Sequence, residues 1–340
     1  MARIATAALD AEPEPQLIGG WAGSVRLPRV RVVSLLAAAV TGRLGPRPGP
    51  QFPRVSFERI LRGSSPVMVA KRECLFAYFA KVLDEPPPGD ITITRHVLSP
   101  VPEADRWADD STPLTALTLH DDGGIEDARG CLQVDFANRF LGGGVLGGGC
   151  VQEEIRFCIS PELIVSMLVC PVMQDHEAVS IDGSQQFSDT VGYGRTFRFD
   201  EPVDVLGPPD TVLAIDAIPF GRDIAEQLTE SMRLRELNKA YCGFATGRAD
   251  VATGNWGCGV FGGSPPLKAL LQWMAASASG RRVRYYGFGD PHLGDLDGAV
   301  QRMGGQTVGA LWRGLAAVAE AGTVTQGAHV YDAVADAMGV

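Results

Sequence analysis

LQVDFANRFLGGGVLGGGCVQEEIRFCISPELIVSML, residues 132–168, is the stretch that decides the fold. Apolar and polar residues alternate from Leu132 to Phe136, which predicts a β-strand with one buried face and with Asp135 on the opposite face. Six glycines follow, at positions 142–144 and 147–149. Glycine tolerates positive φ and lets a ligand approach the backbone, so bare N–H groups can donate to phosphate oxygens.

An acidic pair begins the next segment. Gln152, Glu153 and Glu154 precede an apolar pattern, which predicts a helix with both glutamates at its N-terminus, close to the glycine loop. Consecutive residues on a helix do not face each other, so the two carboxylates are expected to do different jobs. The alternative is ordinary capping of a first helical turn. Strand, loop and acidic pair together favour a site that performs acid–base chemistry on a phosphate-bearing ligand.

Two glycine patterns match the dinucleotide-binding fingerprint G-x-G-x-x-G. Glycines 142, 144 and 147 form one match, and glycines 257, 259 and 262 form the other. Two matches in one chain show how unspecific this pattern is. No isolated acid follows the first match by about 20 residues at the tip of a second strand. A nicotinamide-binding Rossmann domain is therefore the weaker alternative, and the lack of a Gly-Lys dipeptide excludes a P-loop.

Composition restricts the class of protein. The chain has 340 residues, of which 45% are hydrophobic and 21% charged, as in a soluble globular protein of about two structural units. The formal net charge of −10 argues against direct nucleic-acid binding and predicts few Lys or Arg contacts with substrate. No secretory signal is evident, and the apolar run at residues 32–40 is too short to span a bilayer. We therefore expect no membrane association.

The cysteines and histidines predict neither disulfides nor a metal site. The seven cysteines are odd in number and form no C-x-x-C, which predicts reduced, buried thiols in an intracellular, reducing compartment. Cys150 and Cys258 lie in glycine loops, where a thiol can be exposed, but no neighbouring base supports a nucleophile. The five histidines lack ligand spacing, so no metal site is expected.

The pattern along the chain changes at two places. Residues 1–30 are rich in alanine, glutamate, proline and glycine, which predicts little order. Residues 31–88 predict a short helical accessory region, and residues 89–340 an α/β domain in three layers. The predicted helices are 32–41, 56–63, 66–83, 224–241, 265–278, 309–320 and 330–338, and the predicted strands are 91–98, 114–120, 132–136, 179–181, 196–199, 212–218 and 283–288.

Several blocks resemble the signatures of poly(ADP-ribose) glycohydrolases. VDFANRFLGGG and VQEEIRF in the opening stretch are followed in order by VGYG at 191–194, RELNKAYCGF at 235–244, ATGNWGCGVFGG at 252–263 and YGFGD at 286–290. The resemblance implies an α/β/α macrodomain with a mixed central sheet, preceded by a shortened helical extension. It also implies hydrolysis of the ribose–ribose O-glycosidic bonds of poly(ADP-ribose), with release of ADP-ribose and without a cofactor.

The resemblance further implies a cellular setting. The expected partners are poly(ADP-ribose) and poly-ADP-ribosylated proteins, and the expected assembly is a monomer. A place in carbohydrate metabolism and the DNA damage response follows, in the nucleus or cytoplasm if the source is eukaryotic.

Roles for the acidic residues come from the same motifs. Glu154 matches the residue that acts first as general acid and then as general base, since one carboxyl group can serve both proton steps. Glu153 matches a residue that binds ribose hydroxyls, and Asp135 with Asn138 is expected to support the same ribose. A helix N-terminus favours the carboxylate, so burial or the substrate's diphosphate must favour the protonated form of Glu154.

The remaining substrate contacts are also implied by the resemblance. Phe261 is expected against the terminal ribose, Phe288 against adenine, Glu126 at the adenine edge, and Tyr193 over the bound substrate. The other residues implied in substrate binding are Gln152, Asn255 and the loop positions Gly143, Gly144, Gly259 and Val260.

A non-catalytic macrodomain that reads ADP-ribose is the alternative to an enzyme. Such a reader would use the same pocket, so turnover alone separates the two. The intact sequence Gln152-Glu153-Glu154 favours the enzyme, because a reader does not need the second acid.

Overall fold

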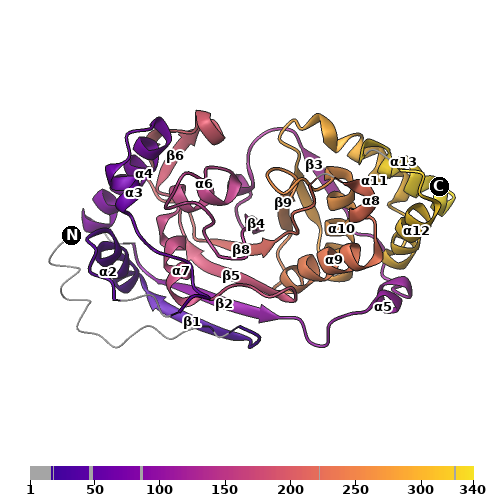
Figure 1. The fold of residues 1–340 in the computed structure, drawn as a ribbon, viewed down its shortest axis with the longest axis horizontal. Coiled ribbons are helices and arrows are strands. Elements are labelled where there is room, and N and C mark those ends of the chain that lie inside the picture. Colours follow the sequence, from indigo (N-terminus) through magenta and orange to yellow (C-terminus); the bar gives the residue numbers. More distant parts are fainter. Residues whose placement is uncertain (1–16, 18, 46–48, 85–86, 222, 325–326) are drawn as a thin grey trace. The chain divides into compact units, whose positions relative to one another are not determined.

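The computed structural model describes residues 17, 19–45, 49–84, 87–221, 223–324 and 327–340. The chain divides into two compact units (Figure 1). The first unit comprises Met1–His96, Ala137–Gln174 and Val179–Ala214, and the second comprises Val97–Phe136, Asp175–Ala178 and Ile215–Val340. Both units contain strands and helices, which confirms the predicted α/β class.

Antiparallel pairing characterises the strands of the first unit. They lie in the order β1 (Gly23–Pro28), β2 (Asp90–Val97), β5 (Glu177–Ser184) and β8 (Asp210–Asp216). Strands β1 and β2 are antiparallel, as are β5 and β8. A separate antiparallel hairpin joins β6 (Ser188–Val191) to β7 (Arg198–Pro202).

Helices of the first unit share one apolar core with these strands. Leu36 and Leu75 from two of the helices are buried in the same cluster as Ile91 and Ile93 of β2. The first two long helices agree with the predictions at 32–41 and 66–83. The helical segments are α2 (Arg29–Val40), α3 (Glu58–Arg62), α4 (Pro66–Asp84), α6 (Gln152–Ile159), η2 (Pro161–Val165), α7 (Ser166–Val169) and η3 (Gly194–Thr196).

Strand β1 corrects the expectation of little order over residues 1–30. Val25 faces Ile93 and Leu27 faces Ile91 across the β1–β2 ladder. Both Val25 and Leu27 are buried, while the residues between them are exposed, so one short strand alternates with a period of two. Composition averaged over the whole stretch conceals this alternation. Residues 1–16 and 18, which fall within the same prediction, lie outside the described residues.

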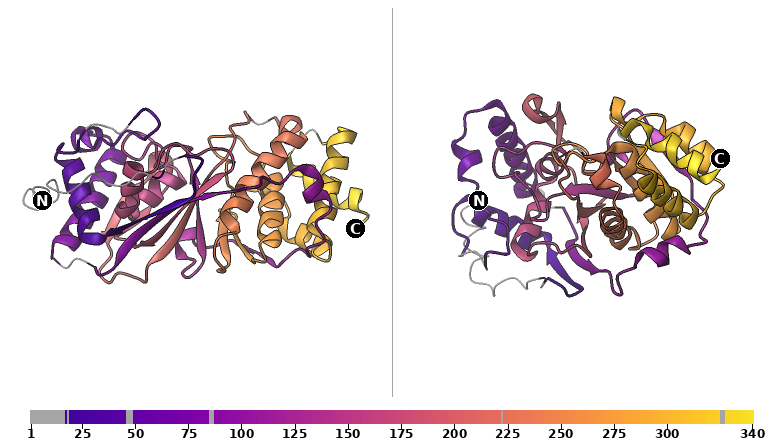
Figure 2. Two further views of the ribbon diagram at one scale, coloured as in Figure 1. Left: turned by 90° about the horizontal axis from the view of Figure 1, so that it is seen from below. Right: turned by 45° about the vertical axis from the view of Figure 1, so that its right-hand side comes forward.

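The second unit is built on parallel strands. Their order is β4 (Leu132–Ala137), β9 (Val251–Gly254), β10 (Val283–Tyr286) and β3 (Leu117–His120), and each neighbouring pair is parallel. Figures 1 and 2 show α9 beside α10 and α12 beside α13. None of the described helices has the length and apolar character needed to cross a bilayer. The helical segments of this unit are α5 (Ala104–Ala108), η1 (Ile125–Asp127), α8 (Ile224–Gln227), α9 (Glu230–Phe244), α10 (Pro265–Ala278), η4 (Pro291–Leu293), α11 (Leu296–Met303), α12 (Val308–Ala321), η5 (Gly327–His329) and α13 (Val330–Met338).

Some element boundaries differ from the sequence predictions. The helix predicted at 224–241 is two helices, α8 and α9, because Thr229 takes an extended N-cap conformation with ψ of 147°. Thr196, predicted to begin a strand, lies in η3. Strand β10 ends at Tyr286, because Phe288 has a positive φ of 53°, which no strand residue can adopt.

The cysteines are largely buried, as predicted. All seven are free, six are buried, and Cys150 beside the glycines is 5% exposed. Burial raises the pKa of the Cys150 thiol to about 11, and it raises that of Cys258 well above its ordinary value. Neither thiol is therefore activated as a nucleophile. Within the described ranges, no group of three or more His, Cys, Asp and Glu residues is arranged to hold a metal ion.

The parallel strands of the second unit bring distant loops to one edge. Tyr286 at the end of β10 is in register with Gly254 of β9 and with His120 of β3. The segments that follow these strands therefore leave from the same edge, and they contain several of the predicted substrate-binding residues. In open α/β sheets, ligands bind outside the carboxyl ends of parallel strands.

Candidate active site

Glu153 lies at the start of α6, as predicted, and its side chain is only 3% exposed. Its two carboxylate oxygens accept hydrogen bonds from different backbone groups. The amide of Asn138 donates at 2.9 Å and the amide of Gly142 donates at 2.7 Å. Glu153 therefore joins the end of β4 to the first glycine loop, which we define as residues 142–149.

Glu154 accepts a separate pair of hydrogen bonds. Its Oε1 accepts from the amide of Gly144 at 2.8 Å, and its Oε2 accepts from the amide of Val151 at 2.8 Å. The second bond is the side chain-to-backbone half of a capping box, so the helix-capping alternative is part of the structure. The first bond is not capping, because Gly144 belongs to the glycine loop. The adjacent glutamates thus accept hydrogen bonds from different backbone groups, and the different jobs expected of them at the site stay a prediction.

Two glycines are required by the close approach of these carboxylates. A Cβ at Gly143 would lie 2.5 Å from Glu153 Oε2 and 2.7 Å from Glu154 Oε1, and the φ of Gly143 is 48°. A Cβ at Gly149 would lie 2.6 Å from Glu154 Oε1 and 2.9 Å from the Cα of Gly144. The glycine loop therefore encloses the two carboxylates so closely that no side chain fits at these positions.

Gly149→Ala tests this enclosure. We expect the added methyl to displace the Glu154 carboxylate and to lower catalytic turnover by about 10- to 100-fold, because misplacement by about 1 Å is enough for such a loss. Gly148→Ala is the matched control, since its Cβ would meet only Arg59 Nη2 at 3.7 Å. Equal turnover in the two variants would show that the close approach at Gly149 does not matter.

A buried lysine holds the first glycine loop from the other side. Lys71 of α4 is 2% exposed, and its ammonium group donates to four carbonyl groups of the loop region. The acceptors are the carbonyl groups of Gly144 at 3.3 Å, Val145 at 2.8 Å, Gly147 at 3.0 Å and Gly149 at shorter range. These bonds fix a glycine-rich segment that would otherwise be costly to order.

Tyr193 lies in a turn attached to the end of the glycine loop. The amide of Gly194 donates to the carbonyl of Cys150 at 2.9 Å, and Thr196 Oγ1 bonds to both the amide and the carbonyl of Tyr193. The side chain of Tyr193 is 56% exposed. An exposed aromatic ring next to the loop suits the predicted role over a bound ligand. Gln152, another predicted substrate-binding residue, is half-buried at the start of α6.

Asp135 corrects the predicted burial pattern of β4. Its side chain is fully buried, and Gln133 two residues earlier is 1% exposed. The Nε2 of Gln133 donates to the backbone carbonyls of Glu126 and Ala128 at 3.4 and 3.3 Å. Strand β4 is therefore covered on both faces, and the alternation of polar residues marks buried polar contacts instead of an exposed face.

The second glycine loop, residues 257–263, connects β9 to α10 in the second unit. Gly259 and Val260 are exposed at its tip, with Val260 80% exposed. The loop is closed by the amide of Gly263, which donates to the carbonyl of Gly257 at 2.9 Å. Phe261 is half-buried, and its carbonyl accepts from the amide of Phe220 at 2.7 Å. The tip thus offers backbone groups close to the start of a helix, an arrangement that suits anions.

Asn255 braces the loop that carries Phe288. Its amide nitrogen donates to the carbonyl of Gly287 at 3.1 Å and to Asp290 at 3.3 Å, while its oxygen accepts from the Tyr285 hydroxyl at 3.0 Å. The side chain of Asn255 therefore shapes this edge of the second unit.

Phe288 is held in a strained backbone conformation and remains 51% exposed. A Cβ at Gly254 would lie 2.4 Å from the backbone oxygen of Tyr286 and 3.0 Å from the Phe288 ring, so glycine is needed there. The ring of Tyr286 lies 6.4 Å from that of Phe288, and Ile125 packs in the same small cluster as Tyr286. Burial raises the pKa of Tyr286, and the nearby charge of Glu126 adds a smaller increase. The structure therefore brings Phe288 and Glu126 to one region of the second unit.

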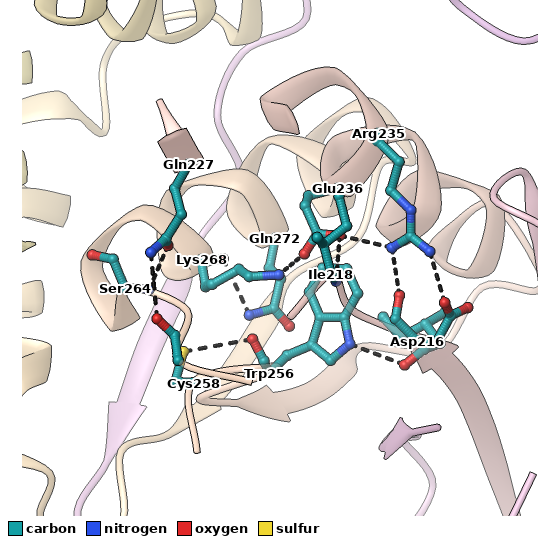
Figure 3. Close-up of polar contacts among 12 residues, drawn as sticks. Asp216, Ile218, Gln227, Arg235, Glu236, Trp256, Cys258, Ser264, Lys268 and Gln272 are labelled. Atoms are coloured by element: carbon teal, nitrogen blue, oxygen red, sulfur yellow. Dashed lines mark hydrogen bonds and ion pairs between the residues drawn. The ribbon is translucent and has the colours of Figure 1, made fainter. Parts of the chain in front are cut away.

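A cluster of buried charges supports the second glycine loop (Figure 3). The ammonium of Lys268 forms an ion pair with Glu236 and lies 3.9 Å from the centre of the Trp256 ring. Arg235 pairs with both Glu236 and Asp216 at 2.7 Å. A Cβ at Gly257 would lie 3.3 Å from Lys268 Nζ, so the loop packs directly on this lysine. Burial lowers the pKa of Lys268 well below its ordinary value.

Glu236→Gln measures what this pair contributes. Removing one charge of a buried pair leaves the other without compensation, so we expect the free energy of unfolding to fall by about 3 kcal/mol. Urea unfolding provides the measurement, and Glu230→Gln, at an exposed position of the same helix, is the control. No loss in Glu236→Gln would show that the ion pair between Lys268 and Glu236 does not stabilise the native protein.

Sequence reasoning did not find Lys71 or Lys268. Each interrupts an apolar helical run, VMVAKREC in one case and PPLKALL in the other. Lysine is rarely fully buried unless it is paired, so a lysine on the apolar face of a helix was the available signal. Their partners are distant in sequence and could not be named from it.

Two family models match this chain, one of a macrodomain fold and one of a helical domain. Residues 104–295 match the family model "Poly (ADP-ribose) glycohydrolase (PARG), Macro domain fold", and residues 1–95 match the helical domain of the same family. The predicted macrodomain fold with a helical N-terminal region is thereby confirmed. Because the macrodomain match covers more than half of the chain, the chain belongs to the poly(ADP-ribose) glycohydrolase family.

Two curated relatives illustrate the similarity. Poly(ADP-ribose) glycohydrolase 1 of Caenorhabditis elegans is 36% identical over 318 residues, which cover 86% of this chain and 40% of the relative. The probable poly(ADP-ribose) glycohydrolase 2 of Arabidopsis thaliana is 34% identical over 307 residues, covering 72% and 58%. The chain thus spans about half the length of these relatives. The Deinococcus radiodurans poly(ADP-ribose) glycohydrolase crystallised with ADP-ribose aligns with 58% of this chain and 90% of its own, at 17% identity and a TM-score of 0.38.

Proposed function

We propose that this chain hydrolyses the ribose–ribose O-glycosidic bonds of poly(ADP-ribose) and releases ADP-ribose. Membership of the family makes this the first activity to test, and the named glycohydrolases that it resembles support it. The observation that carries the proposal is the pair Glu153 and Glu154, two nearly buried carboxylates fixed by separate amides of one glycine loop.

Glu154 is proposed as the proton donor and acceptor. In the first step its proton passes to the departing ribose oxygen as the bond from that oxygen to the anomeric carbon breaks. In the second step water attacks the anomeric carbon and gives its proton to Glu154, which restores the acid. The negative diphosphate of bound substrate is proposed to keep the proton on Glu154 until the bond breaks.

The other predicted residues receive proposed binding roles. Glu153 is proposed to orient ribose hydroxyls, and Asp135 and Asn138 to support the same sugar. In the second unit, the exposed tip at Gly259 and Val260 is proposed to donate to the diphosphate, with Phe261 against the ribose. Phe288, Glu126 and Tyr193 keep the roles that the resemblance implies.

The proposed substrates are poly(ADP-ribose) and proteins that carry it. A reducing, intracellular location is proposed as well, and it is supported by the seven free cysteines, six of which are buried.

A time course of ADP-ribose release from purified poly(ADP-ribose) tests the activity. We expect the folded protein to release ADP-ribose without an added metal or cofactor. If the folded protein binds ADP-ribose but releases none from the polymer, the chain is a reader of ADP-ribose and the proposed hydrolysis is wrong.

A further inference from the structure

A hollow of about 670 Å³ lies beside the first glycine loop, within the first unit. Its volume falls within the range of about 300–1,000 Å³ that is usual for small-molecule pockets. Its lining includes Gly143 and Gly144 but neither the Glu153 nor the Glu154 side chain, so the hollow lies next to the acidic pair without containing it. One wall consists of Gly143, Gly144 and Gly147, and another of Arg54, Arg59 and Arg62. We call this feature the arginine hollow.

The arginine hollow carries surplus positive charge. Arg62 is paired at 2.8 Å with Glu58, which also lines the hollow, so the surplus comes from Arg54 and Arg59. Arg54 and Arg59 are also exposed, and no carboxylate among the described residues lies within ion-pair distance of either guanidinium group. This surplus contrasts with a chain whose formal net charge is −10. A concave basic surface on an acidic protein favours an anionic ligand at that place.

The two walls of the hollow are held by neighbouring residues of one helix. Arg72 of α4 donates to the carbonyls of Ile60, Leu61 and Gly63 at the end of α3, the helix that carries Arg59. Lys71 of the same helix holds the glycine loop. The Arg59 guanidinium lies against the loop, since a Cβ on Gly147 or Gly148 would be 3.7 Å from its terminal nitrogens. Helix α4 therefore holds both the helix that carries Arg59 and the glycine loop that lies against Arg59.

We propose that the arginine hollow binds the diphosphate of a non-terminal ADP-ribose unit of the polymer. This inference rests on the proposed function, which assigns the terminal unit's diphosphate to the second glycine loop. Every further unit of poly(ADP-ribose) carries another diphosphate with two negative charges. Guanidinium groups bind phosphate oxygens through paired, charge-assisted hydrogen bonds. The glycine wall, which has no side chains, leaves room for the polymer beside Arg54 and Arg59.

Binding measurements on a Glu154→Gln background test the hollow without turnover. The Kd of labelled poly(ADP-ribose) and that of free ADP-ribose are measured with and without Arg54→Ala and Arg59→Ala together. We expect the Kd of the polymer to rise by about tenfold, because two charged contacts are lost at about 0.7 kcal/mol each. We expect the Kd of ADP-ribose to change by less than about twofold. The slope of log Kd against log salt should fall by about 1.4, or about 0.7 for each contact by analogy with single-stranded nucleic acid.

Controls separate the possible outcomes. Arg26→Ala removes an exposed arginine that does not line the hollow and should leave the Kd of the polymer unchanged. The single variant Arg59→Gln, checked by thermal unfolding, covers the case in which the double variant does not fold. Equal effects on polymer and ADP-ribose, no effect on either, or equal competition by a single-stranded oligonucleotide would overturn the proposal. Since binding is the readout, a wild-type protein that releases no ADP-ribose would refute the proposed hydrolysis and leave this test valid.

Discussion

Glu154→Gln is expected to lower kcat for ADP-ribose release by about 100- to 10,000-fold, the usual range for loss of a general acid–base group. The amide of glutamine can neither give a proton to the departing oxygen nor take one from water. The binding of free ADP-ribose should be retained, because binding requires no proton transfer. Initial rates on poly(ADP-ribose), together with the Kd of ADP-ribose, measure the two effects separately.

Glu153→Gln is a matched control for this experiment. Both glutamates accept two backbone hydrogen bonds, Glu153 from Asn138 and Gly142, and Glu154 from Gly144 and Val151. Each substitution therefore replaces one accepting oxygen by an NH2 group that faces a backbone donor. Only Glu154→Gln also removes the proposed acid. A loss of kcat in Glu154→Gln that is no larger than the loss in Glu153→Gln would show that the acid–base role assigned to Glu154 is wrong.

The sequence predicted the local elements around this pair. Each element has its own local signal. The alternation from Leu132 places the strand, the glycines place the loop, and the apolar pattern after Glu154 places the helix. Helix α10 begins at Pro265 and ends at Ala278 as expected, because proline favours the first turn and the interior is apolar.

Features that depend on distant residues could not be predicted in the same way. The alternation around Asp135 predicted an exposed face, yet the residue is fully buried, because burial depends on what covers a strand. Strand β1 depends on its partner β2, which lies more than sixty residues later, as in the pair Val25 and Ile93. The lysines behind the two glycine loops likewise have partners far along the chain. For the first loop, loss of the contact with Lys71 is expected to have a large effect on kcat.

Lys71→Met is expected to lower kcat by about 10- to 100-fold, with a smaller effect on the Kd of ADP-ribose. Methionine keeps the apolar part of the side chain, but the carbonyls of Val145, Gly147 and Gly149 lose the ammonium donor, while that of Gly144 keeps only the amide of Gly147. Each buried carbonyl without a partner costs about 1–3 kcal/mol, so the loop is expected to rearrange towards water. Because the amide of Gly144 holds Glu154, a displaced loop also displaces the acid.

Hydrogen exchange of the amides in residues 142–150 provides the direct readout for Lys71→Met. We expect faster exchange in this loop, while the amides of α4 around position 71 remain protected. Lys81→Met is the control, since Lys81 lies on the same helix but donates to the single carbonyl of Asp204 at 2.8 Å. Lys71→Arg keeps the charge and should recover part of the turnover. Unchanged loop exchange with unchanged kcat would show that the glycine loop keeps its shape without the lysine. The expected result would show instead that helix α4 supports catalysis, because α4 would hold the loop that positions the carboxylate of Glu154.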